Sequence, residues 1–556
     1  MTKYTIGVDF GTLSGRAVLV EVKSGREVAD CVMEYPHAVM DETLPGDGRQ
    51  LPPDFALQHP QDYLDVLAAV IPGVLNQAGA VAEEVIAVGV DFTACTMLPT
   101  LADGTPLCFL DEYRDNPHAY VKLWKHHAAQ PYANRLNAIA AERGEDWLKR
   151  YGGKISSEWL FPKIWEILDC APALYARADC FLEAGDWLTW QLCGNKTHGY
   201  TATGYKAIYD KDHGFPSIDF FTALDPRLAD VFDKLDGPIV ESGNPVGIVT
   251  KAAAARFGLA PGTVVAAAST DGHVPAPALG CCHAGDLFAV LGTSACFMLL
   301  GEEDKYVPGI CGTVRDGIMP GFYGYEAGLC CMGDHFAWLA NQAPAEFVEE
   351  AKARNLPVMK IFIERAARLK PGESGLLALN WWNGNRNILV DSELSGMFLG
   401  MNLRTRPEEL MRALIEATAY GTRMIIENFA ASGVPVKRFI ACGGISRKDP
   451  FTMQLYADVL GMDIRIAGSS QVPALATAIF AAVAAGPARG GYATLEEAAA
   501  AMMNISDTVY HPNPEAQAVY NRLFAEYKTL HDYFGRGGND VMKRLRALRA
   551  EAITTK

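Results

Sequence analysis

The segment Thr5–Arg16 places the strictest limits on the fold, because a buried strand, a glycine turn and a return strand follow one another within it. Thr5–Val8 is apolar or small and rich in β-branched side chains, which predicts a buried strand. Ala17–Val22 carries valines at every second position, which predicts a second strand with one apolar face. The chain is therefore expected to begin with a hairpin of an α/β sheet.

The turn of this hairpin contains the groups that bind anions: Gly11, Thr12, Ser14 and Arg16. Glycine lets the main chain approach a ligand closely, so that backbone N–H groups and hydroxyls can reach it. Asp9 follows the first strand, and open α/β sheets bind their ligands at this end of a strand. The pattern indicates a phosphate-binding turn with a carboxylate that holds a metal ion. An ordinary tight hairpin would have the same residues.

The amino-acid sequence at a second strand end repeats that at the first. Gly89–Phe92 has the same four residues as Gly7–Phe10, and it closes a predicted strand at Val85–Val90. We interpret it as a second wall of the same cleft.

A third buried strand leads to another carboxylate. Thr263–Ala268 is apolar and small, and the chain then reaches Asp271 with a glycine directly after it. Such a carboxylate is placed to enter a cleft, but it could equally cap a helix that begins near Pro275.

The pattern then starts again. Asp286–Leu291 is a predicted strand that leads into the Gly-Thr-Ser turn Gly292–Ala295, which mirrors the first turn. Lys437–Cys442 is a further strand, followed by Gly443–Gly444 and by a helix with Asp449 as its N-cap. A double glycine between strand and helix lets a nucleoside lie against the backbone, although it also occurs in ordinary connections. Two such halves are expected to face each other across a cleft.

The composition limits the partners. The 556 residues are enough for two to four domains, and 49% hydrophobic with 21% charged residues indicate a globular chain. A net charge of −16 argues against a nucleic-acid or anionic membrane partner. Size and charge fit a homodimer as well as a monomer.

The cysteines and the apolar runs indicate a cytoplasmic location. The 13 cysteines are an odd number and include adjacent pairs, which is typical of reduced thiols. The start of the chain has no apolar signal core, and Val472–Gly486 is shorter than the roughly 20 residues of a membrane span. We interpret Val472–Gly486 as a buried helix.

In this order, the features resemble the FGGY carbohydrate kinases, which belong to the actin/hexokinase superfold. The resemblance covers almost the whole chain, and within the family it is closest to the kinases that act on L-ribulose. It departs from the family at Leu160 and at Leu329–Met332. The residues that carry it are Asp91–Pro99, Leu123–His127, Lys163–Glu166, Gly204–Ala207, Trp381–Arg386 and Gly396–Glu416.

The resemblance implies two ribonuclease-H-like α/β domains with a catalytic cleft between them. Residues 1–284 would form the sugar-binding domain with the first phosphate turn and the catalytic aspartate. Residues 285–556 would form the nucleotide-binding domain with a helical tail.

The resemblance also implies ATP and Mg²⁺ as cofactors and a small sugar as substrate. Asp271 would be the general base, and Asp9 would hold Mg²⁺ through water. The sugar would contact Ala94, Cys95, Lys206, Asp271 and Glu326. The nucleotide would contact Gly11, Thr12, Ser14, Arg16, Gly292, Thr293, Gly443 and Gly444.

The expected reaction is transfer of a phosphoryl group to the terminal primary hydroxyl of a pentulose, with L-ribulose as the first choice. Two alternatives stay open. One is a sister kinase for D-ribulose, ribitol, xylulose or glycerol, and the other is a nucleotide-gated ATPase that is not a kinase.

Overall fold

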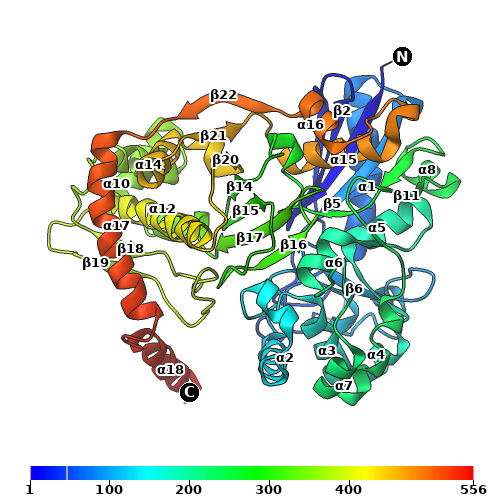
Figure 1. The fold of residues 1–556 in the computed structure, drawn as a ribbon, viewed down its shortest axis with the longest axis horizontal. Helices are drawn as coiled ribbons and strands as arrows, with labels where there is room; N and C mark the ends of the chain where they lie inside the picture. Colours follow the sequence, from blue (N-terminus) through cyan, green and yellow to red (C-terminus); the bar gives the residue numbers. More distant parts are fainter. Residues whose placement is uncertain (1, 46–47, 555–556) are drawn as a thin grey trace. The chain divides into compact units, whose positions relative to one another are not determined.

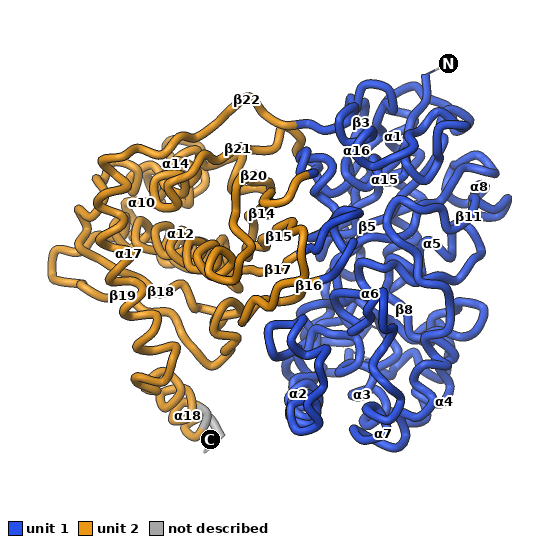
Figure 2. The backbone as a smooth tube through the Cα atoms, viewed as in Figure 1, with its two compact units in different colours: residues 1–282, 314–324, 471–504 blue, residues 283–313, 325–470, 505–556 orange. Residues whose placement is uncertain are grey.

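The computed structural model describes residues 2–45 and 48–554 and divides the chain into two compact units. The first unit consists of residues 1–282, 314–324 and 471–504, and the second of residues 283–313, 325–470 and 505–556 (Figure 2). The expected single boundary between 284 and 285 differs from this division, because two later segments return to the first unit.

The first unit is built on a mixed sheet with the strand order β11-β12-β5-β1-β2-β3. Figure 1 labels β2, β5 and β11 of this sheet. Strand β1 lies in its middle, antiparallel to β2 and parallel to β5, and the short strand β13 also pairs with β5. The strands are β1 Tyr4–Phe10, β2 Ser14–Glu21, β3 Glu27–Glu34, β5 Val85–Phe92, β11 Pro245–Ile248, β12 Val264–Ala266 and β13 Ser269–Thr270.

Helix α15 (Val472–Arg489) explains why a late segment belongs to the first unit. It packs against β1 and β5, while α1 (Pro60–Ala78) packs against β2 and β3. Within the described residues, α15 is also the one helix that is long and apolar enough to cross a membrane. Because it is mostly buried against this sheet, it is the core helix that the sequence predicts.

The rest of the first unit is a helical region with its own aromatic core and a small sheet in the order β4-β7-β6-β8. Its strands are β4 Leu57–Gln58, β6 Met97–Thr100, β7 Val121–Lys122 and β8 Cys180–Glu183. Its helices are α2 Gln130–Arg143, α3 Leu160–Cys170, α4 Pro172–Arg177, α5 Ala184–Cys193, α6 Tyr200–Lys206 and α7 Ile218–Leu224. The first unit also contains β9 His198–Gly199, β10 Ile239–Val240, α8 Lys251–Phe257 and α16 Leu495–Met502.

The second unit repeats the sheet topology of the first. Strand β14 is antiparallel to β15 and parallel to β20, as β1 is to β2 and β5. The complete order is β16-β17-β15-β14-β20-β21-β22. The strands are β14 Asp286–Leu291, β15 Ala295–Gly301, β16 Gly312–Arg315, β17 Tyr323–Leu329, β20 Arg438–Cys442, β21 Ile464–Ala467 and β22 Ile505–Tyr510. A separate pair is formed by β18 Leu377–Leu379 and β19 Met397–Leu399.

Helix α12 is the longest helix of the second unit and packs against α11, α14 and α17 (Figure 1). Its buried residues cover most of its length, which fits a helix that lies between the other helices of the unit. The helices are α9 Gly333–Ala340, α10 Ala345–Arg354, α11 Val358–Ala366, α12 Pro407–Ala431, α13 Gly444–Lys448, α14 Pro450–Leu460, α17 Pro514–Gly535 and α18 Val541–Thr554.

Candidate active site

Three strand ends of the first unit bring three carboxylates to one edge of its sheet. Asp9 of β1 lies in register with Asp91 of β5, so the two copies of the repeated four residues are direct neighbours. The rings of Phe10 and Phe92 stack with centroids 5.2 Å apart. Strand β13 pairs with the end of β5, and Asp271 follows it directly.

The carboxyl groups of Asp9 and Asp91 interact in a buried position. Burial raises the pKa of both groups, and each pKa is affected by the neighbouring carboxyl. Asp91 accepts a hydrogen bond from Thr477 Oγ1 of α15 at 2.5 Å, and Asp9 Oδ2 lies 3.4 Å from Arg16 Nε. A divalent cation would relieve the repulsion between two such carboxylates, so the donor set fits Mg²⁺.

Asp271 is held by its backbone at the end of β5. Its N–H donates to the Phe92 carbonyl at 2.9 Å, and the Gly272 N–H donates to its Oδ1 at 2.7 Å. The pKa of Asp91 is also raised by the charge of Asp271, which indicates that the two carboxylates are close. The alternative that Asp271 caps a helix is wrong, since the next helical turn, Pro277–Leu279, has Ala276 at its N-cap.

The first turn keeps its carbonyl groups bonded to the protein. The Gly11 N–H donates to the Ser14 carbonyl at 3.0 Å, while the Gly11 carbonyl accepts from the Tyr35 hydroxyl at 2.8 Å. The Thr12 carbonyl accepts from Gln58 Nε2 at 2.7 Å. A phosphate is repelled by carbonyl oxygens, so this arrangement favours an anion on the other side of the turn. Arg16 supplies a positive charge and donates to Ser14 Oγ at 3.1 Å.

Trp124 has a role that the sequence did not reveal. Its indole Nε1 donates to Thr12 Oγ1 at 3.1 Å, and this bond fixes the hydroxyl of the first turn. On sequence pattern alone, interleaved tryptophan and lysine residues are more typical of a core than of a site. The signal that would have found it is the resemblance, because Leu123–His127 is one of the stretches that carry it.

The predicted sugar residues Ala94 and Cys95 lie in the loop between β5 and β6. Lys206, the last residue of α6, has its Nζ 4.6 Å from the ring centre of Trp159. The charge of Lys206 lowers the pKa of the Cys95 thiol, against a larger rise caused by burial. The structure therefore brings Lys206 close to the turn that contains Ala94 and Cys95.

The second turn has the same internal hydrogen bond as the first. The Gly292 N–H donates to the Ser294 carbonyl at 3.0 Å. The N–H groups of Met332 and Gly333 donate to the Thr293 and Gly292 carbonyls at 2.9 and 3.0 Å. The stretch Leu329–Met332, where the sequence departs from the family, thus contacts the second turn through the backbone of the buried Met332.

Gly443 and Gly444 differ in what surrounds them. Gly443 has a φ of +92°, and an added Cβ would lie 2.5 Å from the Leu291 carbonyl oxygen, so glycine is required for the fold there. A Cβ added at Gly444 would meet open space. Packing therefore does not require a glycine at Gly444, which leaves room for a ligand at the start of α13. Asp449 caps α14 as predicted, accepting from the Thr452 N–H.

The predicted site residues thus fall into two sets, one in each unit. Glu326 lies in the second unit and is buried in β17, where its backbone carbonyl accepts from the Cys311 N–H at 2.8 Å. The first set is Asp9, Gly11, Thr12, Ser14, Arg16, Ala94, Cys95, Lys206 and Asp271, and the second is Gly292, Thr293, Glu326, Gly443 and Gly444.

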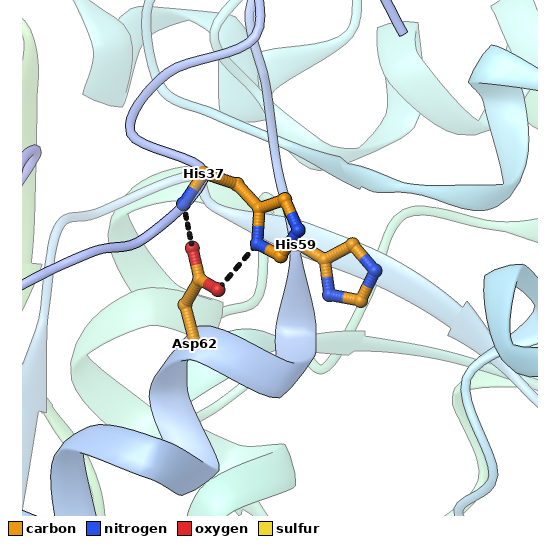
Figure 3. A group of neighbouring side chains, drawn as sticks. All are labelled: His37, His59 and Asp62. Atoms are coloured by element: carbon orange, nitrogen blue, oxygen red, sulfur yellow. Dashed lines mark hydrogen bonds and ion pairs between the residues drawn. The ribbon is translucent and has the colours of Figure 1, made fainter. Parts of the chain in front are cut away.

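His37, His59 and Asp62 form a further cluster of metal-ligating types at the start of α1 (Figure 3). Asp62 accepts from the His37 backbone N–H at 3.1 Å and lies 2.6 Å from His37 Nδ1, while His59 Nδ1 accepts from the Gln61 N–H. The two rings stack with centroids 4.4 Å apart and planes 17° apart. Ring nitrogens of stacked rings point side by side and do not converge on one ion, so we interpret the cluster as a support for the start of α1.

Comparison with known families accounts for both units. Residues 4–277 match the N-terminal domain of the FGGY family of carbohydrate kinases, and residues 287–485 match its C-terminal domain. The fold of the chain is similar to that of a xylulose kinase from Rhodospirillum rubrum, with a TM-score of 0.77 and 22% identity over 95% of this chain and 98% of the other. It is also similar to a gluconate kinase from Lactobacillus acidophilus, with a TM-score of 0.79 and 18% identity over 97% and 99% of the two chains.

Relatives of higher identity extend over the full length. A ribulokinase from Geobacillus thermodenitrificans is 53% identical over 556 residues, which are 100% of this chain and 98% of the relative. A ribulokinase from Mycolicibacterium smegmatis is 48% identical over 99% of this chain and 97% of its own length. The expected two-domain α/β fold and the expected family are both confirmed. The chain belongs to the FGGY family of carbohydrate kinases and is a sugar phosphotransferase that uses ATP.

Proposed function

We propose that this kinase phosphorylates the terminal primary hydroxyl of L-ribulose and forms L-ribulose 5-phosphate, a reaction of L-arabinose catabolism. The observation that carries this proposal is the 53% identity to a ribulokinase over the complete chain. The stretches Asp91–Pro99 and Gly204–Ala207, which contain Ala94, Cys95 and Lys206, support it, since both carry the resemblance to kinases that act on L-ribulose.

Asp271 acts as the general base in the proposed reaction. Its carboxylate accepts the proton of the sugar hydroxyl, while the hydroxyl oxygen bonds to the γ-phosphorus and the bond from that phosphorus to the oxygen of ADP breaks. The two backbone hydrogen bonds at Asp271 and Gly272 support this role, because they hold the carboxylate at a strand end. General-base catalysis contributes typically about 10²–10⁴-fold in rate.

The two glycine turns bind the phosphates. In the first turn, Thr12 and Ser14 offer their hydroxyl groups and Arg16 offers its guanidinium, while Gly11 lets the main chain approach the phosphate closely. In the second unit, Gly292 allows the same close approach and Thr293 offers its hydroxyl, and Gly443 and Gly444 lie under the adenosine. The matching internal hydrogen bonds at Gly11 and Gly292 support a common role for the two turns.

Asp9 holds Mg²⁺ through water, next to Asp91. Mg²⁺ retains several of its waters in proteins and takes few carboxylate ligands, so one or two acids are sufficient. When bound, it neutralises charge on the β- and γ-phosphates. The buried carboxyl pair supports this assignment, because burial raises the pKa of both neighbouring groups and a bound cation would stabilise their charged forms.

The sugar is bound by the backbone at Ala94 and Cys95 and by the side chains of Lys206 and Glu326. Lysine and glutamate can hydrogen-bond the hydroxyl groups that distinguish one pentulose from another. The location we propose is the cytoplasm, and the 13 cysteines, all of which are free, support a reducing compartment.

The test is an ADP-release assay with ATP and a panel of substrates: L-ribulose, D-ribulose, ribitol, D-xylulose and glycerol. We expect the highest kcat/KM with L-ribulose. A higher kcat/KM with another compound would identify that compound, and not L-ribulose, as the preferred substrate. ADP release that no sugar stimulates would favour the nucleotide-gated ATPase and overturn the proposal.

A further inference from the structure

The loop that contains the predicted sugar residues has a strained backbone. Cys95 has a φ of +60°, a left-handed conformation that is unfavourable for a residue other than glycine. The side chain is buried, so the residue is not at a solvent-exposed turn where such strain is easily relieved. Something in the surroundings must hold this conformation.

The side chains of a lysine and a glutamate hold the peptide group that follows. The Lys163 Nζ donates to the Cys95 carbonyl at 2.5 Å, and the Thr96 N–H donates to Glu183 Oε2 at 2.9 Å. The Cys95 carbonyl and the Thr96 N–H belong to the same peptide unit. The lysine and the glutamate therefore clamp one peptide plane at both ends and prevent it from turning over.

The clamp comes from rigid elements. Lys163 lies in α3 and also donates to the Leu123 carbonyl at 2.9 Å, so its ammonium is fixed by two carbonyls. Glu183 is the last residue of β8 and the N-cap residue of α5. The Ala184 N–H donates to the Thr96 carbonyl at 2.7 Å, which binds the turn to the same strand end.

The ammonium of Lys163 is costly to bury. Lys163 is completely buried, and burial lowers its pKa while the charge of Glu183 raises it. A buried charged group is weak evidence for stability, because apolar residues of similar size often replace such groups without loss of stability. Lys163 and Glu183 are therefore better explained by the peptide orientation that they impose than by stability.

We propose that Lys163 and Glu183 are positioning residues that fix the Cys95–Thr96 peptide and thereby the shape of the sugar-binding turn. This inference rests on the proposed function, because Ala94 and Cys95 are assigned to the sugar there. Lys163 does not contact the nucleotide in this proposal, so its loss acts on the sugar alone.

The first test is Lys163→Met, which keeps the length and apolar part of the side chain and removes the ammonium. We expect the KM for L-ribulose to rise about 10- to 100-fold, as a small misplacement of a binding group does, with the KM for ATP within about twofold of wild type. Lys122→Met is the matched control, because Lys122 is equally buried but pairs with Glu166 at 3.1 Å. The control is expected to lower thermal stability and to leave the KM for L-ribulose unchanged.

The second test uses the strain at Cys95. Glycine adopts a positive φ without penalty, so Cys95→Gly added to Lys163→Met is expected to recover part of the lost sugar affinity. Glu183→Gln keeps an oxygen acceptor for the Thr96 N–H and is expected to retain a KM near wild type, whereas Glu183→Ala raises it.

The outcomes separate this inference from the proposed function. Wild-type enzyme without activity on L-ribulose would overturn the proposed function. Active wild type, combined with an unchanged sugar KM in Lys163→Met or an equal rise in the KM for ATP, would overturn the clamp alone. If Lys163→Met does not fold, Glu183→Ala compared with Glu183→Gln decides: equal sugar KM values in the two variants would reject it.

Discussion

Gly7 of β1 lies directly opposite Gly89 of β5, and helix α15 passes over both. A Cβ added at Gly7 would lie 1.9 Å from the Ala474 carbonyl oxygen, and one at Gly89 would lie 2.8 Å from that of Thr477. The same helix sends the Thr477 hydroxyl to Asp91. The glycines of the repeated four residues therefore admit the helix that orients one of the carboxylates of the site.

Gly7→Ala is expected to destabilise the protein strongly. The backbone of α15 cannot move away locally, so the variant overpacks the core and loses about 1–3 kcal/mol or more of unfolding free energy. Urea unfolding followed by circular dichroism measures this loss. A variant as stable as wild type would show that α15 does not lie this close to β1.

Gly444→Ala is expected to act on the nucleotide and not on the fold. An added Cβ there meets open space at the first residue of α13, so stability should stay within about 0.5 kcal/mol of wild type. If adenosine lies against this glycine, the methyl group displaces it, and the KM for ATP rises about 10-fold or more. Steady-state kinetics with saturating sugar measures the effect. An unchanged KM for ATP would show that the adenosine does not lie against α13.

The elements that could be predicted from the sequence are those whose signal is local. Thr5–Val8, Val85–Val90 and Asp286–Leu291 are short apolar runs that lead into polar turns, and each is a strand of a central sheet. The cap at Asp449 and the mirrored turn at Gly292 depend on neighbouring residues only, and they too were visible before the structure.

The contacts that could not be predicted are tertiary. Helix α15 is apolar on nearly all sides, so its pattern shows burial but not the sheet on which it packs. For the same reason the return of residues 471–504 to the first unit was not foreseen. The bond from Trp124 to Thr12 joins residues that no local periodicity relates.

Asp271→Asn tests the general base. The amide keeps the shape of the side chain and still accepts from the Gly272 N–H, so the variant should fold and bind ATP. It cannot take the proton of the sugar hydroxyl, and kcat is expected to fall about 10²–10⁴-fold. Asp316→Asn is a control at an aspartate of the same unit that pairs with Lys211. Turnover near that of wild type in Asp271→Asn would reject the assignment.

Asp9→Asn tests the metal site. Removal of one negative charge weakens the hold on Mg²⁺ and its waters, so the Mg²⁺ concentration for half-maximal activity is expected to rise roughly 10- to 100-fold. The KM for L-ribulose, measured at saturating Mg²⁺, should stay close to wild type. A Mg²⁺ titration that coincides with that of wild type would contradict the role of Asp9.

Glu183 is expected to make stability depend on pH in a way that Glu183→Gln removes. Burial raises the pKa of Glu183 from 4.5 to about 7 in the folded protein. Between these two values the folded state retains the proton and the unfolded state does not, so the contribution of the neutral carboxyl to stability is present at low pH and is lost as the pH rises toward 7.

Glutamine does not titrate, and Glu183→Gln should therefore gain stability relative to wild type between pH 5 and pH 8, by about 1–3 kcal/mol. Urea unfolding at pH 5, 6, 7 and 8 measures the difference, and Glu349→Gln at an exposed glutamate controls for the substitution itself. Parallel stability curves for wild type and Glu183→Gln would mean that Glu183 is already ionised throughout this range. The Thr96 N–H would then be held by a charged carboxylate throughout this pH range, with the Lys163 ammonium on the carbonyl at the other end of the same peptide.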